Sequence, residues 1–217
     1  MRSLFISGIG TGVGKTLAAA VLAEALQADY WKPVQAGYSD GTDSQWVNDV
    51  LRDPAGRVHP ELYRLKLAAS PHLSARAQGV EISLDAIADR YQSILDHPRA
   101  NPDGWLIIEG AGGLLVPLNE KDWIIDLIEK LDTQVIIVSR NYLGSINHSL
   151  LTARVCQSRK VKVLGWVFND RYLDYESEIV KWTGIQSIAS LPFAASPDRD
   201  FVRQQAERIR SRLMSIL

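Results

Sequence analysis

A glycine-rich segment near the N-terminus carries the clearest chemical signal in this sequence. Gly8–Thr16 has glycine at every second position as far as Gly14 and ends in Gly-Lys-Thr. Glycine leaves backbone N–H groups free to curl around phosphate oxygens. In such a loop Lys15 would contact the β- and γ-phosphates of a nucleotide, and the hydroxyl of Thr16 would coordinate Mg²⁺. The segment therefore predicts a phosphate loop, although Gly8 stands one residue earlier than the strict Gly-x-x-x-x-Gly-Lys-Thr spacing requires.

A phosphate loop that binds magnesium also needs a carboxylate. The apolar run Trp105–Ile108 predicts a strand, and Glu109 follows it directly. An acid after a buried strand is typical of a Walker-B arrangement, and the glycines behind it would let the backbone approach the transferred phosphoryl group. The alternative is an acid that merely caps the next turn. Asp43 is a second candidate ligand, although aspartate is common in turns for other reasons.

The surrounding elements indicate how these residues are held. Short apolar runs rich in β-branched and aromatic residues predict strands at Leu4–Ser7, Trp105–Ile108, Val135–Val138, Val163–Phe168 and Ile188–Leu191, with Tyr30–Val34 as a weaker candidate. Amphipathic patterns predict helices over 17–25, 84–95 and 202–213. The runs do not alternate polar and apolar residues, which is typical of parallel strands covered on both faces. We expect an α/β fold: a doubly wound, mainly parallel sheet flanked by helices on both faces, of P-loop NTPase type.

Composition narrows the class of protein. The 217 residues are 46% hydrophobic and 23% charged with a net charge of −1, which excludes a disordered or fibrous chain and a strong field toward nucleic acid or anionic lipid. We expect one domain over residues 1–217, with the irregular segment 39–80 forming functional loops around short helices. A single cysteine, the lack of a long apolar stretch and a short N-terminal segment before the glycines predict a cytoplasmic protein without signal peptide or membrane span.

Several segments, in this order, resemble the dethiobiotin synthetase family. They are Lys32–Gly37, Ser70–His72, Glu109–Gly113, Leu143–His148 and Gly165–Asp170. The phosphate loop of that family has the longer spacing found here, and the resemblance extends to at least Pro192. It implies ATP-dependent conversion of 7,8-diaminopelargonic acid and CO₂ to dethiobiotin through a carbamate that ATP phosphorylates. No protein nucleophile is required, so catalysis would consist of positioning and charge neutralisation.

The resemblance also implies roles for individual residues. Lys15 and Lys32 would flank the transferred phosphoryl group and the carbamate, and Thr11 would contact substrate and phosphate. The implied Mg²⁺ ligands are Thr16, Asp43 and Glu109. Nucleotide contacts are expected at Gly12, Val13, Gly14, Lys15, Thr16, Leu17, Asn169 and Pro192, where Asn169 would bind the adenine amino edge.

Substrate contacts are implied at Lys32, Ala36, Gly110, Gly112, Leu143, Gly144, Ser145 and Asn147. The last four precede or open a helix, and a helix N-terminus favours an anion. In the family this helix start binds the substrate carboxylate from the neighbouring subunit, which implies a homodimer with shared active sites. His148 is expected to be structural, and His72 receives no role.

Some positions depart from the family pattern and leave alternatives open. Ile9 and Gly10 replace Thr and Asp in the phosphate loop, and Ala36 stands where Ser or Thr is common. One alternative is a related ATP-dependent amidoligase, although no glutamine-hydrolysing domain is evident. Another is a regulatory switch ATPase, although the extra lysine near the start of its phosphate loop is missing here. A protein that only binds nucleotide is a third, and Asn169 does not begin the Asn-Lys-x-Asp pattern of a GTPase.

Overall fold

The computed structural model describes residues 1–97, 104–170 and 173–217, and a seven-stranded sheet runs through them. Its order is β4-β2-β6-β1-β7-β8-β9, and every pair of neighbouring strands is parallel. The strands are β1 (Arg2–Gly8), β2 (Asp29–Trp31), β4 (Val58–His59), β6 (Trp105–Gly113), β7 (Gln134–Arg140), β8 (Val163–Asn169) and β9 (Ser187–Leu191). A separate parallel pair consists of β3 (Val34–Ala36) and β5 (Tyr63–Leu65).

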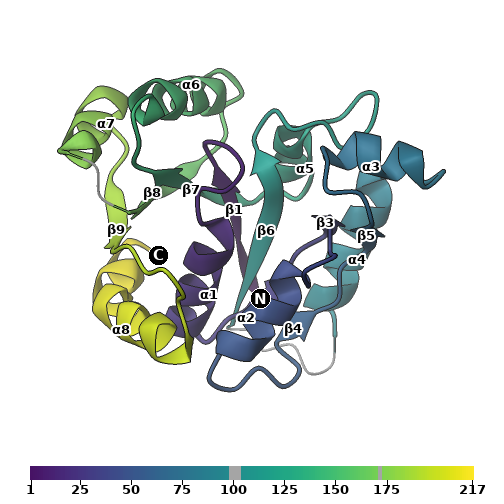
Figure 1. The fold of residues 1–217 in the computed structure, drawn as a ribbon, viewed down its shortest axis with the longest axis horizontal. Coiled ribbons are helices and arrows are strands. Elements are labelled where there is room, and N and C mark those ends of the chain that lie inside the picture. Colours follow the sequence, from purple (N-terminus) through teal and green to yellow (C-terminus); the bar gives the residue numbers. More distant parts are fainter. Residues whose placement is uncertain (98–103, 171–172) are drawn as a thin grey trace.

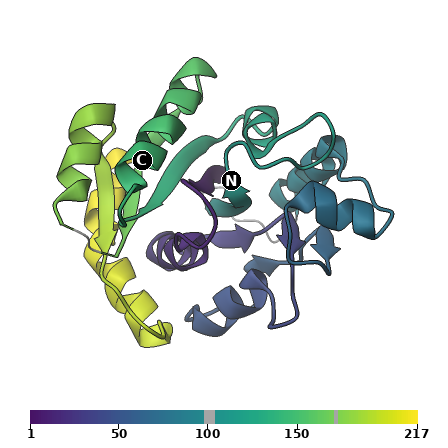
Figure 2. The same cartoon turned by 45° about the horizontal axis from the view of Figure 1, so that its top comes forward.

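Helices cover both faces of the main sheet (Figures 1 and 2). One face packs on α1 (Lys15–Leu26), α2 (Asp43–Val50) and α8 (Arg199–Ile216). The other packs on α3 (Pro71–Ala77), α4 (Leu84–Leu95), α5 (Ile124–Lys130), α6 (Ser145–Ser158) and α7 (Tyr175–Thr183). Within β1, Leu4 and Ile6 join the first apolar core and Phe5 joins the second. Burial on both faces explains the unbroken apolar runs, and the predicted α/β fold is confirmed.

The structure differs from the sequence prediction at three places. The run Tyr30–Val34 is two strands, because β2 ends at Trp31 and β3 begins at Val34. Pro33 lies between them and has no N–H to donate to the sheet, so the chain leaves the main sheet there. The segment 39–80 contains β4 and β5 in addition to its helices, and β6 continues through Glu109 to Gly113.

The carboxyl ends of the parallel strands meet at one edge of the sheet. The loop after β1, the end of β6 and the start of α6 all lie at this edge (Figure 1). In open parallel sheets this edge is where ligands bind. Among the described residues no helix is long and apolar enough to cross a membrane, and the cytoplasmic location stays a prediction.

Candidate functional site

The phosphate loop joins β1 to α1 and depends on its glycines. Gly12 and Gly14 have φ values of 72° and 87°, in the left-handed region that favours glycine. At Gly14 there is also no space for a side chain, because a Cβ there would lie 2.0 Å from Nδ2 of Asn169. The same Nδ2 donates a hydrogen bond to the carbonyl of Val13 at 3.1 Å. The end of β8 therefore fixes the last turn of the loop before α1 begins.

Lys15 folds back over this loop. Its Nζ donates to the carbonyl of Gly10 at 2.9 Å, and its side chain is buried. Burial lowers the pKa of Lys15 to about 8; nearby Lys32 adds to this effect, whereas Glu109 and Asp43 oppose it. An anionic ligand in the loop would favour the charged ammonium and raise this pKa.

Lys32 lies between two carboxylates. Its Nζ is 3.0 Å from Oε1 of Glu109 and also pairs with Asp43. Lys32 is 6% exposed and Glu109 is 1% exposed, so this pair is almost completely shielded from water. Burial lowers the pKa of Lys32, but the two carboxylates more than offset that effect and raise it above its ordinary value. Lys32 is therefore a permanent cation at neutral pH.

Glu109 accepts hydrogen bonds from three side chains. Its Oε1 accepts hydrogen bonds from the Thr16 hydroxyl and from Lys32, both at 3.0 Å. Its Oε2 accepts a hydrogen bond from the hydroxyl of Tyr30 at 2.8 Å. Tyr30 was not predicted from the sequence as a site residue. A usable signal existed, because Tyr30 precedes Lys32 by two residues and strand side chains alternate between faces.

A capping box holds Asp43 at the start of α2. The Thr42 hydroxyl accepts a hydrogen bond from the N–H of Gln45, and the Gln45 side chain accepts one from the N–H of Thr42. The N–H of Asp43 donates to the side-chain oxygen of Gln35 at 3.3 Å. These contacts place the Asp43 carboxylate in the first helical turn, facing Lys32.

The three predicted magnesium ligands form a suitable set of oxygen donors. Thr16 and Lys32 both contact Glu109, and Lys32 links it to Asp43, so a cation already sits between the two carboxylates. Mg²⁺ typically binds one or two carboxylates together with water and phosphate oxygens. Within the described ranges, no three His, Cys, Asp or Glu side chains cluster as a metal site. A magnesium ion here would therefore rely on the Thr16 hydroxyl and on a phosphate ligand.

A cavity of about 770 Å³ unites most of these residues. The predicted residues that line it are Thr11, Gly12, Gly14, Lys15, Thr16, Lys32, Ala36, Asp43, Glu109 and Gly112. The lining residues without a predicted role are Gln35, Ala68, Ala69, Ser70, Pro71, Ala111 and Val116. Ser70 and Pro71 belong to a segment that the family resemblance included, and the Ser70 hydroxyl lies 3.1 Å from Nδ1 of His72.

The remaining predicted residues lie outside this cavity. They are Val13, Leu17, Gly110, Leu143, Gly144, Ser145, Asn147, Asn169 and Pro192. Gly110 packs inside the sheet, where an added Cβ would lie 2.6 Å from the ring of Phe5. Ser145 is buried and its hydroxyl accepts a hydrogen bond from the N–H of Tyr142, whereas Leu143 is 77% exposed. Gly144 precedes α6 as its N-cap, as predicted for a helix start.

Of the departures from the family pattern, Ile9 has a local structural explanation, whereas Gly10 and Ala36 have none. Ile9 is half-buried and packs against both apolar cores, which a threonine would fill less well. Gly10 supplies the carbonyl that Lys15 contacts, and a Cβ at Gly10 would meet nothing within 4 Å. The loop is therefore closed by backbone contacts without the two polar side chains.

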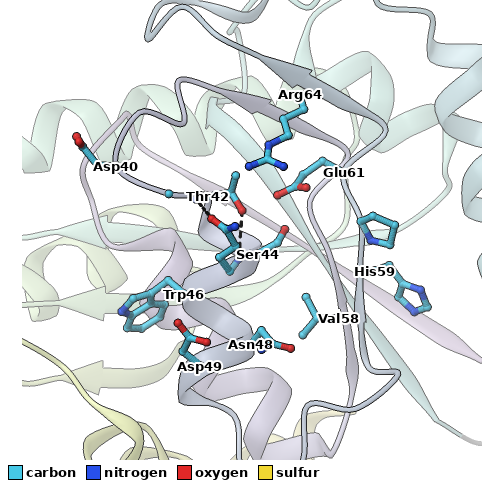
Figure 3. Close-up of a pocket in the computed structure, with 13 residues that line it drawn as sticks. Asp40, Thr42, Ser44, Trp46, Asn48, Asp49, Val58, His59, Glu61 and Arg64 are labelled. Atoms are coloured by element: carbon cyan, nitrogen blue, oxygen red, sulfur yellow. Dashed lines mark hydrogen bonds between the residues drawn. The ribbon is translucent and has the colours of Figure 1, made fainter.

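A second cavity, of about 620 Å³, borders the start of α2 (Figure 3). Thr42, Ser44 and Trp46 border it from α2, and Val58, His59 and Glu61 border it from β4 and the following loop (Figure 3). None of the site residues predicted from the sequence lines this cavity. Thr42 and Ser44 line this second cavity, whereas Asp43 between them lines the first.

Comparisons with known proteins agree with the sequence resemblance. A family model described as an AAA domain matches residues 2–199. The chain is 51% identical to the ATP-dependent dethiobiotin synthetase BioD of Cytophaga hutchinsonii over 85% of each chain, and 40% identical to that of Christiangramia forsetii over 99% of each.

Solved structures resemble the chain in fold alone. The MinD cell division protein of Aquifex aeolicus matches with a TM-score of 0.60 at 16% identity, over 99% of this chain and 97% of that one. A ParA family ATPase from Chlorobium tepidum matches with a TM-score of 0.56 at 15% identity, over 99% and 92%.

Proposed function

Because the chain belongs to the ATP-dependent dethiobiotin synthetase family, we propose that it forms dethiobiotin from 7,8-diaminopelargonic acid, CO₂ and ATP in biotin biosynthesis. The observation that carries the proposal is the cavity in which the phosphate loop faces Lys32, a buried cation held beside Glu109. Such a cavity can bring two anions, a triphosphate and a carbamate, into contact. The proposed reaction needs no nucleophile from the protein, because the substrate supplies both nucleophiles.

The proposed reaction has three steps. One amine of the substrate adds to CO₂ and loses a proton, which gives a carbamate. A carbamate oxygen then attacks the γ-phosphorus of ATP, and the bond to ADP breaks. The second amine attacks the carbamate carbon, loses a proton and expels phosphate, which closes the ring.

Two lysines neutralise the charges that must meet. Lys15 would bind the β- and γ-phosphates, since its ammonium already lies on the loop backbone. Lys32 would bind the carbamate beside the γ-phosphoryl group and stabilise the negative charge that develops between them. Mg²⁺ held by Thr16, Asp43 and Glu109 would neutralise further phosphate charge. Thr11 would contact both substrates from the rim of the cavity.

The ends of the two substrates extend beyond this cavity. The adenine would lie near Asn169 and Pro192; the contact of Asn169 with Val13 supports this, because it places the amide against the phosphate loop. The substrate carboxylate would bind the segment Leu143–Asn147 of a second copy of the chain. The exposure of Leu143 and the position of this segment outside its own cavity support a homodimer with shared sites.

The test is the complete reaction with a matched pair of variants. Purified protein with diaminopelargonate, bicarbonate and MgATP should yield dethiobiotin and ADP in equal amounts. Lys32→Met should abolish turnover and retain ATP binding, whereas Lys121→Met, at an exposed lysine, should leave both unchanged. Phosphate release that does not depend on diaminopelargonate would contradict the proposal and favour a switch ATPase. Sedimentation of the same preparations tests the homodimer.

A further inference from the structure

Tyr30 is a buried polar residue that the proposed reaction does not use directly. Its side chain is 0% exposed, and its hydroxyl donates to Oε2 of Glu109 at 2.8 Å. The pairing of β2 with β6 sets Tyr30 opposite Ile107, two residues before Glu109. Because side chains on one face repeat every second residue, this register directs Tyr30 along the sheet toward Glu109. A buried hydroxyl without a partner would be costly, and the hydrogen bond to Glu109 removes that cost.

The carboxylate of Glu109 divides its contacts unequally. Oε1 accepts hydrogen bonds from both Thr16 and Lys32, and all three residues line the cavity. Among the contacts of the described residues, Oε2 accepts only from Tyr30. The hydroxyl therefore fixes the rotation of the carboxylate about its terminal bond. Terminal carboxylate torsions are broad, so a contact of this kind is needed to select one orientation.

We propose that Tyr30 is a positioning residue, which holds Glu109 so that Oε1 remains shared between Thr16 and Lys32. The inference rests on the proposed function, in which Glu109 contributes to magnesium binding and Lys32 binds the carbamate. Without the hydroxyl, Oε2 loses its donor and the carboxylate rotates to bind the Lys32 ammonium through both oxygens. That rotation removes Oε1 from Thr16 and draws Lys32 away from the substrate.

Packing also holds the ring of Tyr30 in place. The phenol ring packs in the same apolar core as α1 and α2, the helices that carry Thr16 and Asp43. Tyr30 thus contacts Glu109 from the sheet, and Glu109 contacts Thr16 of α1 directly and Asp43 of α2 through Lys32.

The test compares Tyr30→Phe with Tyr91→Phe. Tyr91 donates one hydroxyl hydrogen bond to Ser3 at 2.9 Å, outside the cavity, so its variant is a matched loss of one hydrogen bond. ATP affinity is measured by calorimetry with and without Mg²⁺, together with kcat and the melting temperature. Tyr30→Phe should lower kcat at least tenfold and lower the gain in ATP affinity from Mg²⁺ at least fivefold, with Mg²⁺-free affinity unchanged. Tyr91→Phe should leave kcat and the Mg²⁺-dependent gain in ATP affinity within twofold of their wild-type values.

A double-mutant cycle shows whether Tyr30 acts through Glu109. In a Glu109→Gln background, Tyr30→Phe should change the Mg²⁺-dependent gain less than twofold, because coupled residues are not additive. Equal effects of Tyr30→Phe in both backgrounds, or a wild-type gain in Tyr30→Phe, would overturn the inference alone. Absence of any Mg²⁺-dependent gain in the wild-type protein would overturn the magnesium assignment and the inference with it.

Discussion

Replacement of Lys32 by methionine tests the electrostatics of the cavity without any substrate. Methionine keeps most of the length of the side chain and removes the ammonium. Among the contacts that the structure describes, Glu109, at 1% exposure, then retains the hydrogen bonds from Thr16 and Tyr30. Asp43 is less affected, because its side chain is 34% exposed and water can solvate it.

The size of the effect follows from this geometry. Removal of one partner of a buried ion pair costs about 3–5 kcal/mol of folding free energy. Because two donors to Glu109 remain and Asp43 can be solvated, we expect the lower end, about 3 kcal/mol. For a chain of this length that loss lowers the melting temperature by about 6–12 °C. The additional replacement Glu109→Gln removes the uncompensated charge and should restore most of the loss.

The assay is unfolding in urea, analysed by linear extrapolation, for Lys32→Met, the double variant and the exposed control Lys121→Met. The raised pKa of Lys32 fixes the pH dependence. A group whose pKa is raised by folding contributes its full stability below its unfolded value, here 10.5, and loses it as the pH rises through the higher folded value. The difference between wild type and Lys32→Met should therefore be constant near neutrality and shrink only above pH 10.5. This reasoning is refuted if Lys32→Met has the same free energy of unfolding as wild type, or if the double variant is no more stable than Lys32→Met.

Two further predictions concern the phosphate loop. Because burial lowers the pKa of Lys15 to about 8, ATP affinity should fall as the pH rises through this value. Calorimetry in two buffers above pH 8 should detect proton uptake on ATP binding. If Lys15→Met leaves the pH dependence of ATP affinity unchanged, this assignment is contradicted. Gly14→Ala combines a φ of 87° with a clash against Asn169 and should weaken ATP binding at least tenfold. Gly184→Ala has a φ of 69° and nothing within 4 Å of the added Cβ, so it should lower the melting temperature without changing ATP affinity. Equal ATP affinities of the two variants would refute the role of the clash.

The elements that depend on local patterns could be predicted from the sequence. The buried strands β1, β7, β8 and β9 were predicted to within one or two residues of their ends, because their apolar runs are covered on both faces. Helix α4 was predicted with its bounds, and in the structure Ser83 is its N-cap, whose side chain accepts a hydrogen bond from the N–H of Ala86. Capping and periodicity are properties of neighbouring residues, so sequence alone contains them.

The elements that depend on distant partners could not be predicted in this way. β4 has only two residues, and its pairing with β2 is what makes it a strand. The contact between Tyr30 and Glu109 joins residues 79 positions apart and requires the register of β2 on β6. The phosphate-loop and Walker-B patterns identified Lys15, Glu109 and Asp43 as candidates. The family resemblance added Lys32, and the structure brings these four together. Their roles in the reaction stay predictions until the variants are measured.

The double pairing of Lys32 has a consequence for selectivity. An anion that enters the cavity must compete for this ammonium with Glu109 and Asp43, which are tethered to the chain and never diffuse away. These two carboxylates therefore act as tethered competitors, and free phosphate or carboxylate metabolites should bind to Lys32 only weakly. A ligand that brings compensating positive charge for Asp43 displaces this carboxylate from Lys32 at a lower free-energy cost. The cavity should therefore bind such ligands in preference to simple anions.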